Sequence, residues 1–144
     1  MNSPAVLFLC TGNSCRSQMA EGWARHFHED AFQAYSAGIV AHGINPHAVK
    51  VMQEAGVDIS TQPSKTTEDL PRTDFDLVVT VCAHADEHCP VFAGARRVFH
   101  RGFDDPPKLA KQAQTDEEQL APYRRVRDEI RDFVRDELCL LISP

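Results

Sequence analysis

A continuous apolar run, Ala5–Cys10 (AVLFLC), lies near the start of the chain and is followed at once by the turn residues TGN at 11–13. Short apolar runs without alternation are typical of strands that are buried on both faces of a parallel sheet. From Ser17 to about Glu29, apolar residues recur at helical spacing with charged residues between them, which indicates a helix. Strand, tight loop and helix in this order form the repeating unit of parallel α/β sheets.

Three further segments have strand character. They are Phe32–Ala37, Leu77–Val81 and, more weakly, Arg97–His100. Strands that alternate with helices predict an α/β fold with an open, mostly parallel sheet and helices on both faces. Because no repeat or linker divides the chain, we expect a single domain over residues 1–144.

Two more helices are predicted from the pattern. Asn45 and Pro46 begin one that Gly56 ends. A long amphipathic helix follows Pro122. Its apolar stripe consists of Val126, Ile130, Phe133, Val134, Leu138 and Leu141. The polar segment Lys108–Gln119 before it is predicted to be a surface loop or a short helical turn.

The composition excludes several classes of function. A formal net charge of -6 argues against a protein that mainly binds nucleic acid or an anionic membrane. No apolar run approaches the roughly 20 residues that span a bilayer, and the first residues lack the basic region of a signal peptide. We therefore expect a soluble, cytoplasmic monomer in which any anion site is local.

The five cysteines are an odd number and fall well below the density of about 8–10% that marks a disulfide scaffold. In a reducing compartment such cysteines are packed, bind metal or react. Cys10, Cys82 and the pair Asp104-Asp105 all follow predicted strands. Ligands of parallel sheets bind beyond the carboxyl ends of the strands, so these residues can line one binding site.

The segment CTGNSCRS, from Cys10 to Ser17, has the chemistry of an anion site. Its small residues connect a thiol at a strand end to Arg16 at a helix start, so that backbone N–H groups and the helix N-terminus face one point. Arg16 can hold two oxygens of a tetrahedral oxyanion, and a thiol in such a position ionises readily. Cys10 is therefore predicted to be a thiolate nucleophile, with Ser17 donating a hydrogen bond to its sulfur.

The longer segment CTGNSCRSQMAEG (10–22) resembles the signature loop of the low-molecular-weight protein tyrosine phosphatases and of the arsenate reductases that share their fold. The resemblance covers nearly the whole chain and implies an open four-stranded parallel sheet flanked by helices. The substrate-binding loop that it implies consists of Thr11, Gly12, Asn13, Ser14, Cys15, Arg16 and Ser17. Cys15 is either a small packed thiol or a secondary oxidation site.

The segment Phe103-Asp104-Asp105-Pro106 matches the acid loop of the same family. The resemblance implies that Asp105 is the general acid that protonates the departing oxygen. Without it, both aspartates suit a solvated turn, which an Asp-Pro sequence always permits.

A second cysteine-bearing segment, VCAHADEHCP at 81–90, admits a zinc site or a redox relay. The possible zinc ligands are Cys82, His84, His88 and Cys89. Their spacing matches neither a zinc finger nor a zinc ribbon. In a relay, Cys82 would attack the arsenic-bound sulfur of Cys10 and release arsenite, and Cys89 would then move the disulfide towards solvent. The segment resembles the redox segment of thioredoxin-coupled arsenate reductases, which implies these roles and thioredoxin as the partner.

Two positions depart from these families. Pro107-Lys108 follows the acid loop where the phosphatases carry tyrosines, which favours a small inorganic oxyanion over phosphotyrosine. Lys65 stands where reductases of this group often have an aspartate that helps to hold a potassium ion. The other residues of that ion site are Asn13, Glu21 and Ser36. Because a lysine cannot ligate a cation, Lys65 either supplies the positive charge itself or is an ordinary surface residue.

The predicted function is therefore the reduction of arsenate to arsenite without a cofactor, with phosphate or sulfate as competing anions. A phosphatase that acts on small phosphoesters or phosphotyrosine is one alternative, and it would not need Cys82 or Cys89. An arsenic- or redox-sensing module, which binds the oxyanion without turnover, is another. Glutaredoxin or a small thiol could replace thioredoxin as the electron donor.

Overall fold

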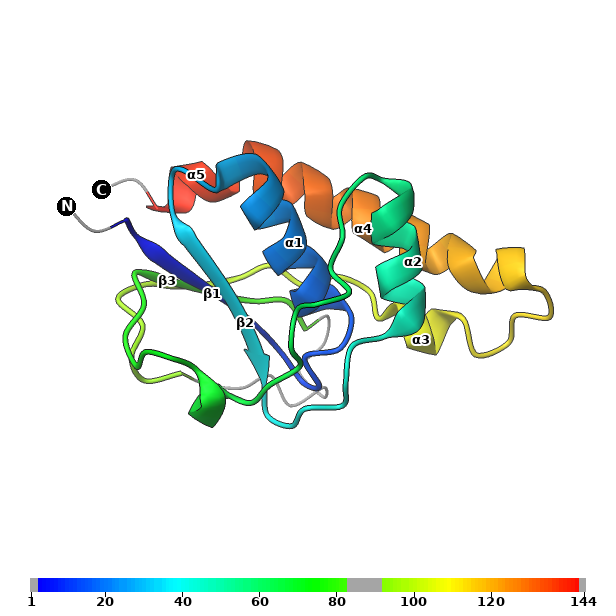
Figure 1. Ribbon diagram of the computed structural model, residues 1–144, viewed down its shortest axis with the longest axis horizontal. Coiled ribbons are helices and arrows are strands. Elements are labelled where there is room, and N and C mark those ends of the chain that lie inside the picture. Colours follow the sequence, from blue (N-terminus) through cyan, green and yellow to red (C-terminus); the bar gives the residue numbers. More distant parts are fainter. Residues whose placement is uncertain (1–2, 83–91, 143–144) are drawn as a thin grey trace.

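The computed structural model describes residues 3–82 and 92–142, and its centre is a four-stranded parallel sheet with the strand order β2-β1-β3-β4 (Figure 1). The strands are β1 (Ala5–Cys10), β2 (Gln33–Gly38), β3 (Leu77–Thr80) and β4 (Val98–His100). Each strand lies within a residue or two of its predicted position. The predicted fold class is therefore confirmed.

Five α-helices and one short 3₁₀ helix are described. They are α1 (Arg16–His28), α2 (Pro46–Glu54), the 3₁₀ helix η1 (Thr67–Asp69), α3 (Pro106–Leu109), α4 (Asp116–Asp136) and α5 (Leu138–Ile142). Figure 1 shows α1, α2, α4 and α5 on one side of the sheet. Within residues 3–82 and 92–142, every helix is too short or too polar to cross a membrane.

The central strand β1 is buried along its whole length, as its unbroken apolar sequence predicts. Its alternate residues Val6 and Phe8 belong to the larger apolar cluster, which includes residues of α1 and α4. Leu7 and Leu9 point to the other face, where the described cluster consists of strand and loop residues such as Phe75. Helices were expected on both faces, but the described ones cover only one.

The long C-terminal helix differs from the prediction at both ends. Helix α4 begins at Asp116, because the Thr115 hydroxyl accepts a hydrogen bond from Glu118 N at 3.1 Å. Pro122 therefore lies inside the helix, where the N–H group that it lacks would bond to the first turn. The segment predicted as a loop over Lys108–Gln119 thus contains the end of α3 and the first turn of α4.

The other end of this helix is interrupted at Glu137, so that Leu138 and Leu141 belong to the separate helix α5. Helix α2, in contrast, begins as predicted. The Asn45 side chain caps it by accepting hydrogen bonds from His47 N at 2.8 Å and Ala48 N at 3.3 Å.

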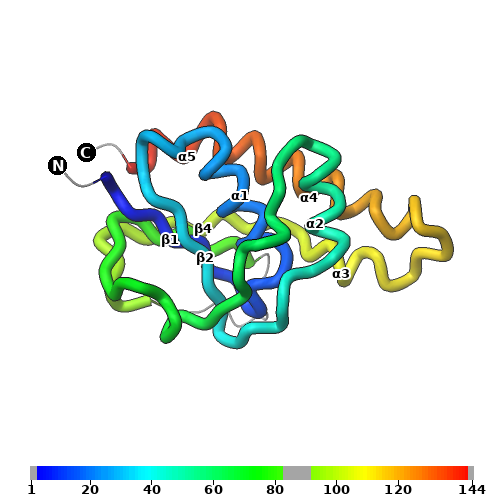
Figure 2. Tube along the Cα trace, viewed as in Figure 1, coloured from blue at the N-terminus to red at the C-terminus, as the bar shows by residue number. Residues whose placement is uncertain are grey.

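Two loops meet beyond the carboxyl end of the sheet. The loop that follows β1 and the segment that follows β2 run side by side there, as the blue and cyan parts of the trace show (Figure 2). The fold thus brings together the predicted anion loop and residues 39–45, which lie about 30 positions later in the chain.

Candidate anion site

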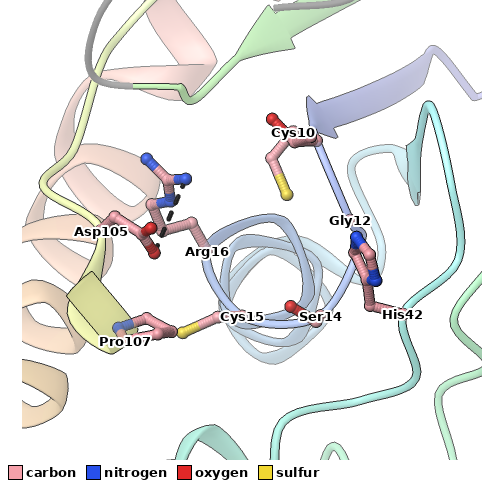
Figure 3. Close-up of a pocket in the computed structure, with 9 residues that line it drawn as sticks. Cys10, Gly12, Ser14, Cys15, Arg16, His42, Asp105 and Pro107 are labelled. Carbon is pink, nitrogen blue, oxygen red and sulfur yellow. Dashed lines mark ion pairs between the residues drawn. The ribbon is translucent and has the colours of Figure 1, made fainter. Parts of the chain in front are cut away.

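A pocket opens where β1 meets the start of α1, and most of the predicted loop surrounds it (Figure 3). Its lining residues are Cys10, Thr11, Gly12, Ser14, Cys15, Arg16, His42, Asp105 and Pro107. Three separate parts of the chain therefore contribute: the anion loop, the segment after β2 and the acid loop before α3.

Cys10 is the last residue of β1 and is almost fully buried, with 4% of its surface exposed. Its Sγ lies 3.0 Å from the Ser17 hydroxyl. Asn13 Nδ2 donates to the same hydroxyl oxygen at 2.9 Å. Because that oxygen already accepts a hydrogen bond, its own hydrogen is available for the Cys10 sulfur, as the sequence predicts.

Asn13 gives the anion loop its shape. It has a φ of 47°, in the left-handed region, which asparagine tolerates better than most residues. Its side chain is held from two sides: Nδ2 also donates to Ser36 Oγ at 3.0 Å, and Oδ1 accepts from Lys65 N at 2.9 Å. This fully buried side chain therefore supports the nucleophile loop without lining the pocket.

The end of β2 passes very close to the same loop. A Cβ atom at Gly38 would lie 2.6 Å from Thr11 O and 2.8 Å from Asn13 N, so only glycine fits. Gly38 pairs with Cys10 in the sheet. This contact places the nucleophile against a backbone that cannot easily shift.

Arg16 connects the anion loop to the acid loop. Its buried guanidinium donates from Nη1 to Phe103 O at 2.9 Å, and its Nη2 lies 3.8 Å from Asp105 Oδ1 (Figure 3). Asp104 instead points to the surface and pairs with Arg125 at 2.9 Å. The structure therefore brings Asp105 to the pocket and leaves Asp104 outside it, in agreement with the choice that the resemblance implied.

Cys15 also lines the pocket, but its chemistry differs from that of Cys10. Burial raises the pKa of the Cys15 thiol well above its ordinary value, and the neighbouring Cys10 raises this pKa further, against the opposing effect of Arg16. Cys15 is thus held as a neutral thiol. This agrees with its interpretation as a small packed side chain.

Cys82 follows β3 and is fully buried in the same apolar cluster as Cys10. It is not among the residues that line the pocket. Its predicted partner Cys89 lies outside the described residues, as do His84 and His88 of the zinc alternative. The roles of Cys82 and Cys89 stay predictions.

Lys65 lies beside the carboxylate of Glu21, with its Nζ 3.9 Å from Oε1. Ser36 donates to the same oxygen at 2.6 Å, and the Arg25 guanidinium is 2.8 Å from Oε2, as an ion pair without hydrogen-bond geometry. Two cationic side chains therefore balance a fully buried carboxylate. Since Lys65 brings positive charge to this place, the residues present do not fit a potassium ion.

His42 is a pocket residue that the sequence patterns did not single out. It lies across the loop from Arg16 and Asp105 (Figure 3). Its position just after the second predicted strand is the same signal that identified Cys10 and Cys82. No motif marked it, because its neighbours Ala41 and Gly43 are ordinary loop residues.

Comparison with known proteins agrees with this geometry. Residues 5–138 match the low molecular weight phosphotyrosine protein phosphatase family. The chain belongs to this family.

Several relatives within this family are arsenate reductases. That of Halalkalibacterium halodurans is 55% identical over 90% of this chain and 91% of its own length. The Bacillus subtilis arsenate reductase is 48% identical over 94% of this chain and 96% of its own. A solved structure of an arsenate reductase in its phosphate-binding state has a TM-score of 0.78 and 31% identity, and the match covers 99% of this chain and all (100%) of the other. The family expected from the sequence is thus confirmed.

Proposed function

We propose that this protein reduces arsenate to arsenite by a relay of three thiols, Cys10, Cys82 and Cys89, and that thioredoxin regenerates it in the cytoplasm. The relatives that are arsenate reductases, at 48% and 55% identity over nearly the whole chain, support the overall reaction.

In the first step the oxyanion binds in the loop against Arg16 and the backbone N–H groups. The Cys10 thiolate attacks arsenic and forms a sulfur–arsenic bond, and an oxygen leaves as water. Asp105 donates the proton to that departing oxygen. Its position beside Arg16 on the pocket wall suits this role.

In the second step the Cys82 thiolate attacks the sulfur of Cys10. A disulfide forms, the sulfur–arsenic bond breaks, and its electron pair stays on arsenic, which leaves as arsenite. Cys89 then attacks Cys82, so that Cys10 is released as a thiolate and a Cys82–Cys89 disulfide remains. An external dithiol reduces that disulfide and restores the enzyme.

The observation that carries this proposal is the burial of a second thiol at the end of the strand next to the nucleophile. Strands β1 and β3 are paired, with Leu9 opposite Thr80, and Val81 N donates to Leu9 O at 2.9 Å. Cys82 therefore follows β3 one residue beyond the level at which Cys10 ends β1. A phosphatase of this family needs only the nucleophile, the arginine and the acid, so a redox step explains a second buried thiol at this position.

The pocket also suits a small inorganic substrate. Pro107 forms part of its wall at the place where the phosphatases carry a tyrosine. A pyrrolidine ring offers no broad aromatic surface for a phosphotyrosine ring. This favours a compact tetrahedral oxyanion such as arsenate.

The decisive experiment is Cys89→Ser, because the relay gives Cys89 no part in binding or in the first attack. One equivalent of arsenite should form per enzyme, after which turnover should stall with Cys10 joined to Cys82. Peptide mass spectrometry and arsenite release in a single-turnover assay measure both outcomes. Cys139→Ser, at an exposed cysteine on α5, is the matched control and should turn over at the wild-type rate. Wild-type turnover of Cys89→Ser with thioredoxin would rule out the three-thiol relay.

A further inference from the structure

The segment that follows β2, residues 39–45, is bonded along its length to the anion loop. Ile39 N donates to Thr11 O at 2.9 Å, and His42 N donates to Gly12 O at 3.0 Å. The carbonyl oxygens of Thr11 and Gly12 are thus paired with backbone donors of this segment. The segment and the anion loop are therefore held together at two successive residues of the loop.

The same segment is anchored at its far end as well. Asn45 N donates to Ser14 O at 2.8 Å, and Gly43 N donates to the Ser64 hydroxyl at 3.1 Å. The backbone on both sides of His42 is thus fixed relative to the loop. The imidazole is presented from a positioned backbone, although the side chain itself remains solvent-accessible.

The His42 ring packs directly on Gly12. A Cβ atom at Gly12 would lie 2.2 Å from His42 Cδ2 and 3.1 Å from Cγ. Gly12 is not among the residues with a positive φ, so its backbone conformation does not require glycine. The imidazole lies directly against the loop at Gly12, so that a side chain at this position would have to displace it.

Besides Arg16, a second side chain that lines the pocket can serve as a cationic hydrogen-bond donor. Among the described residues that line it, Arg16 and His42 are the two that can carry positive charge. The Arg16 guanidinium already donates to Phe103 O and pairs with Asp105 on one side of the pocket. His42 lies on the opposite side (Figure 3).

We infer that His42 is an oxyanion-binding residue, whose imidazole donates a hydrogen bond to an oxygen of the bound tetrahedral anion on the side opposite Arg16. The inference rests on the proposed function, since it concerns the same site. The imidazole acts on substrate affinity. It contacts an oxygen that stays on arsenic while Cys10 attacks, so it stabilises the bound anion and the transition state alike.

The test compares His42→Ala and His42→Gln with wild type in two measurements, sulfate binding to the reduced protein by calorimetry and steady-state arsenate reduction. In His42→Ala, the Kd for sulfate and the KM for arsenate should both rise about 10- to 150-fold, the range expected for a hydrogen bond to a charged group, with kcat changed by less than about twofold. His42→Gln keeps a hydrogen-bond donor, so its Kd and KM should lie between those of wild type and His42→Ala. His26→Ala, at an exposed histidine of α1 outside the pocket, should match wild type.

A second variant tests the contact with Gly12. Gly12→Ala should displace the imidazole and weaken sulfate binding in the wild-type background. In the His42→Ala background, where the space is vacant, the same substitution should weaken sulfate binding much less. An unchanged Kd and KM in a folded His42→Ala protein would overturn the inference and leave the proposed function intact. A wild-type protein that neither binds sulfate nor reduces arsenate would overturn both.

Discussion

Cys10 and Cys15 are two buried thiols in one short loop, yet their surroundings assign them different chemistry. Cys10 ends a strand and faces the Ser17 hydroxyl at 3.0 Å. Cys15 is almost fully buried, and this burial raises its pKa so that it stays protonated. The attacking group in the proposed reaction is therefore Cys10, although both sulfurs line the pocket.

Removing either main group of this site should abolish reduction while the fold survives. In Cys10→Ser no arsenite should form, because a hydroxyl cannot carry the electron pair to arsenic. In Arg16→Ala the loss of kcat/KM should be at least about 100-fold, since a positioned charge on the anion disappears. Arsenite production and circular dichroism measure the two effects, with the surface variant Arg125→Ala as the control. Activity within a few-fold of wild type in either variant would contradict the site assignment.

The cluster of charged side chains around Glu21 is a second feature that depends on individual residues. Burial lowers the pKa of the Lys65 ammonium, and the Glu21 carboxylate opposes this shift. Only 15% of the Lys65 side chain is exposed, so it is not an ordinary surface lysine. Through Ser36 and Asn13, the Glu21 carboxylate is connected to the nucleophile loop. Lys65 is thus linked to the nucleophile loop through Glu21, Ser36 and Asn13.

If Lys65 supplies the charge of a potassium ion, the wild-type enzyme should be indifferent to potassium. Replacing it with choline at equal ionic strength should leave kcat/KM unchanged within about twofold. Lys65→Asp should create a dependence on potassium, because a carboxylate can ligate the ion together with oxygens of Glu21 and Ser36. Lys50→Asp, at an exposed lysine of α2, should stay indifferent. Strong and specific activation of the wild-type enzyme by potassium would show that Lys65 does not replace the ion.

At the scale of single elements, α2 is attached to the site by the residue that caps it. The side-chain oxygen Oδ1 of Asn45 accepts the cap hydrogen bonds, and its Nδ2 donates to the hydroxyl of the buried Tyr123 of α4 at 3.1 Å. One side chain thus begins a helix and connects it to a second one. Its backbone N–H meanwhile bonds to Ser14 of the anion loop.

Asn45→Ala should therefore lower the free energy of unfolding by about 0.5–2 kcal/mol, the range for a lost N-cap. Asn45→Asp keeps an oxygen at the cap and should retain most of that stability. Urea unfolding measures the difference between the two variants. Equal stability of Asn45→Ala and wild type would show that the cap contributes nothing to α2.

At the scale of the whole molecule, the site is assembled from three separate segments. The anion loop precedes α1, the segment 39–45 follows β2, and the acid loop precedes α3. Arg16 joins the first to the third through Phe103 O, and Phe103 itself packs against Phe133 of α4 with a ring distance of 6.0 Å. The core of the domain and the position of Asp105 therefore depend on one another.

This assembly should also cleave an aryl phosphate weakly. Phosphate and arsenate have the same shape and charge, and cleavage needs only the anion loop and Asp105, without Cys82 or Cys89. Hydrolysis of p-nitrophenyl phosphate by wild type should be detectable and should disappear in Cys10→Ser. In Cys89→Ser it should persist. Efficient phosphatase activity without arsenate reduction would show that the protein is a phosphatase rather than an arsenate reductase.

The amino-acid pattern by itself determined the sequence positions of the four strands and of the three longer helices, as well as the position of the anion loop with its thiol and arginine. These are local properties: backbone preferences and apolar periodicity act over a few residues, and strand ends follow from them. The pattern misplaces the start of α4, because Pro122 indicates a boundary whereas the Thr115 cap and three acidic residues stabilise an earlier start.

Only the tertiary structure decided which of two adjacent aspartates faces the pocket, that Lys65 lies beside Glu21, and that His42 packs on Gly12. Each of these contacts joins residues that are 30 or more positions apart in the chain. Asp105 and Lys65 were named from family resemblance, and His42 was missed altogether. Such contacts depend on how strands pair and how loops cross, and this is set by the packing of the whole domain rather than by any short stretch of sequence.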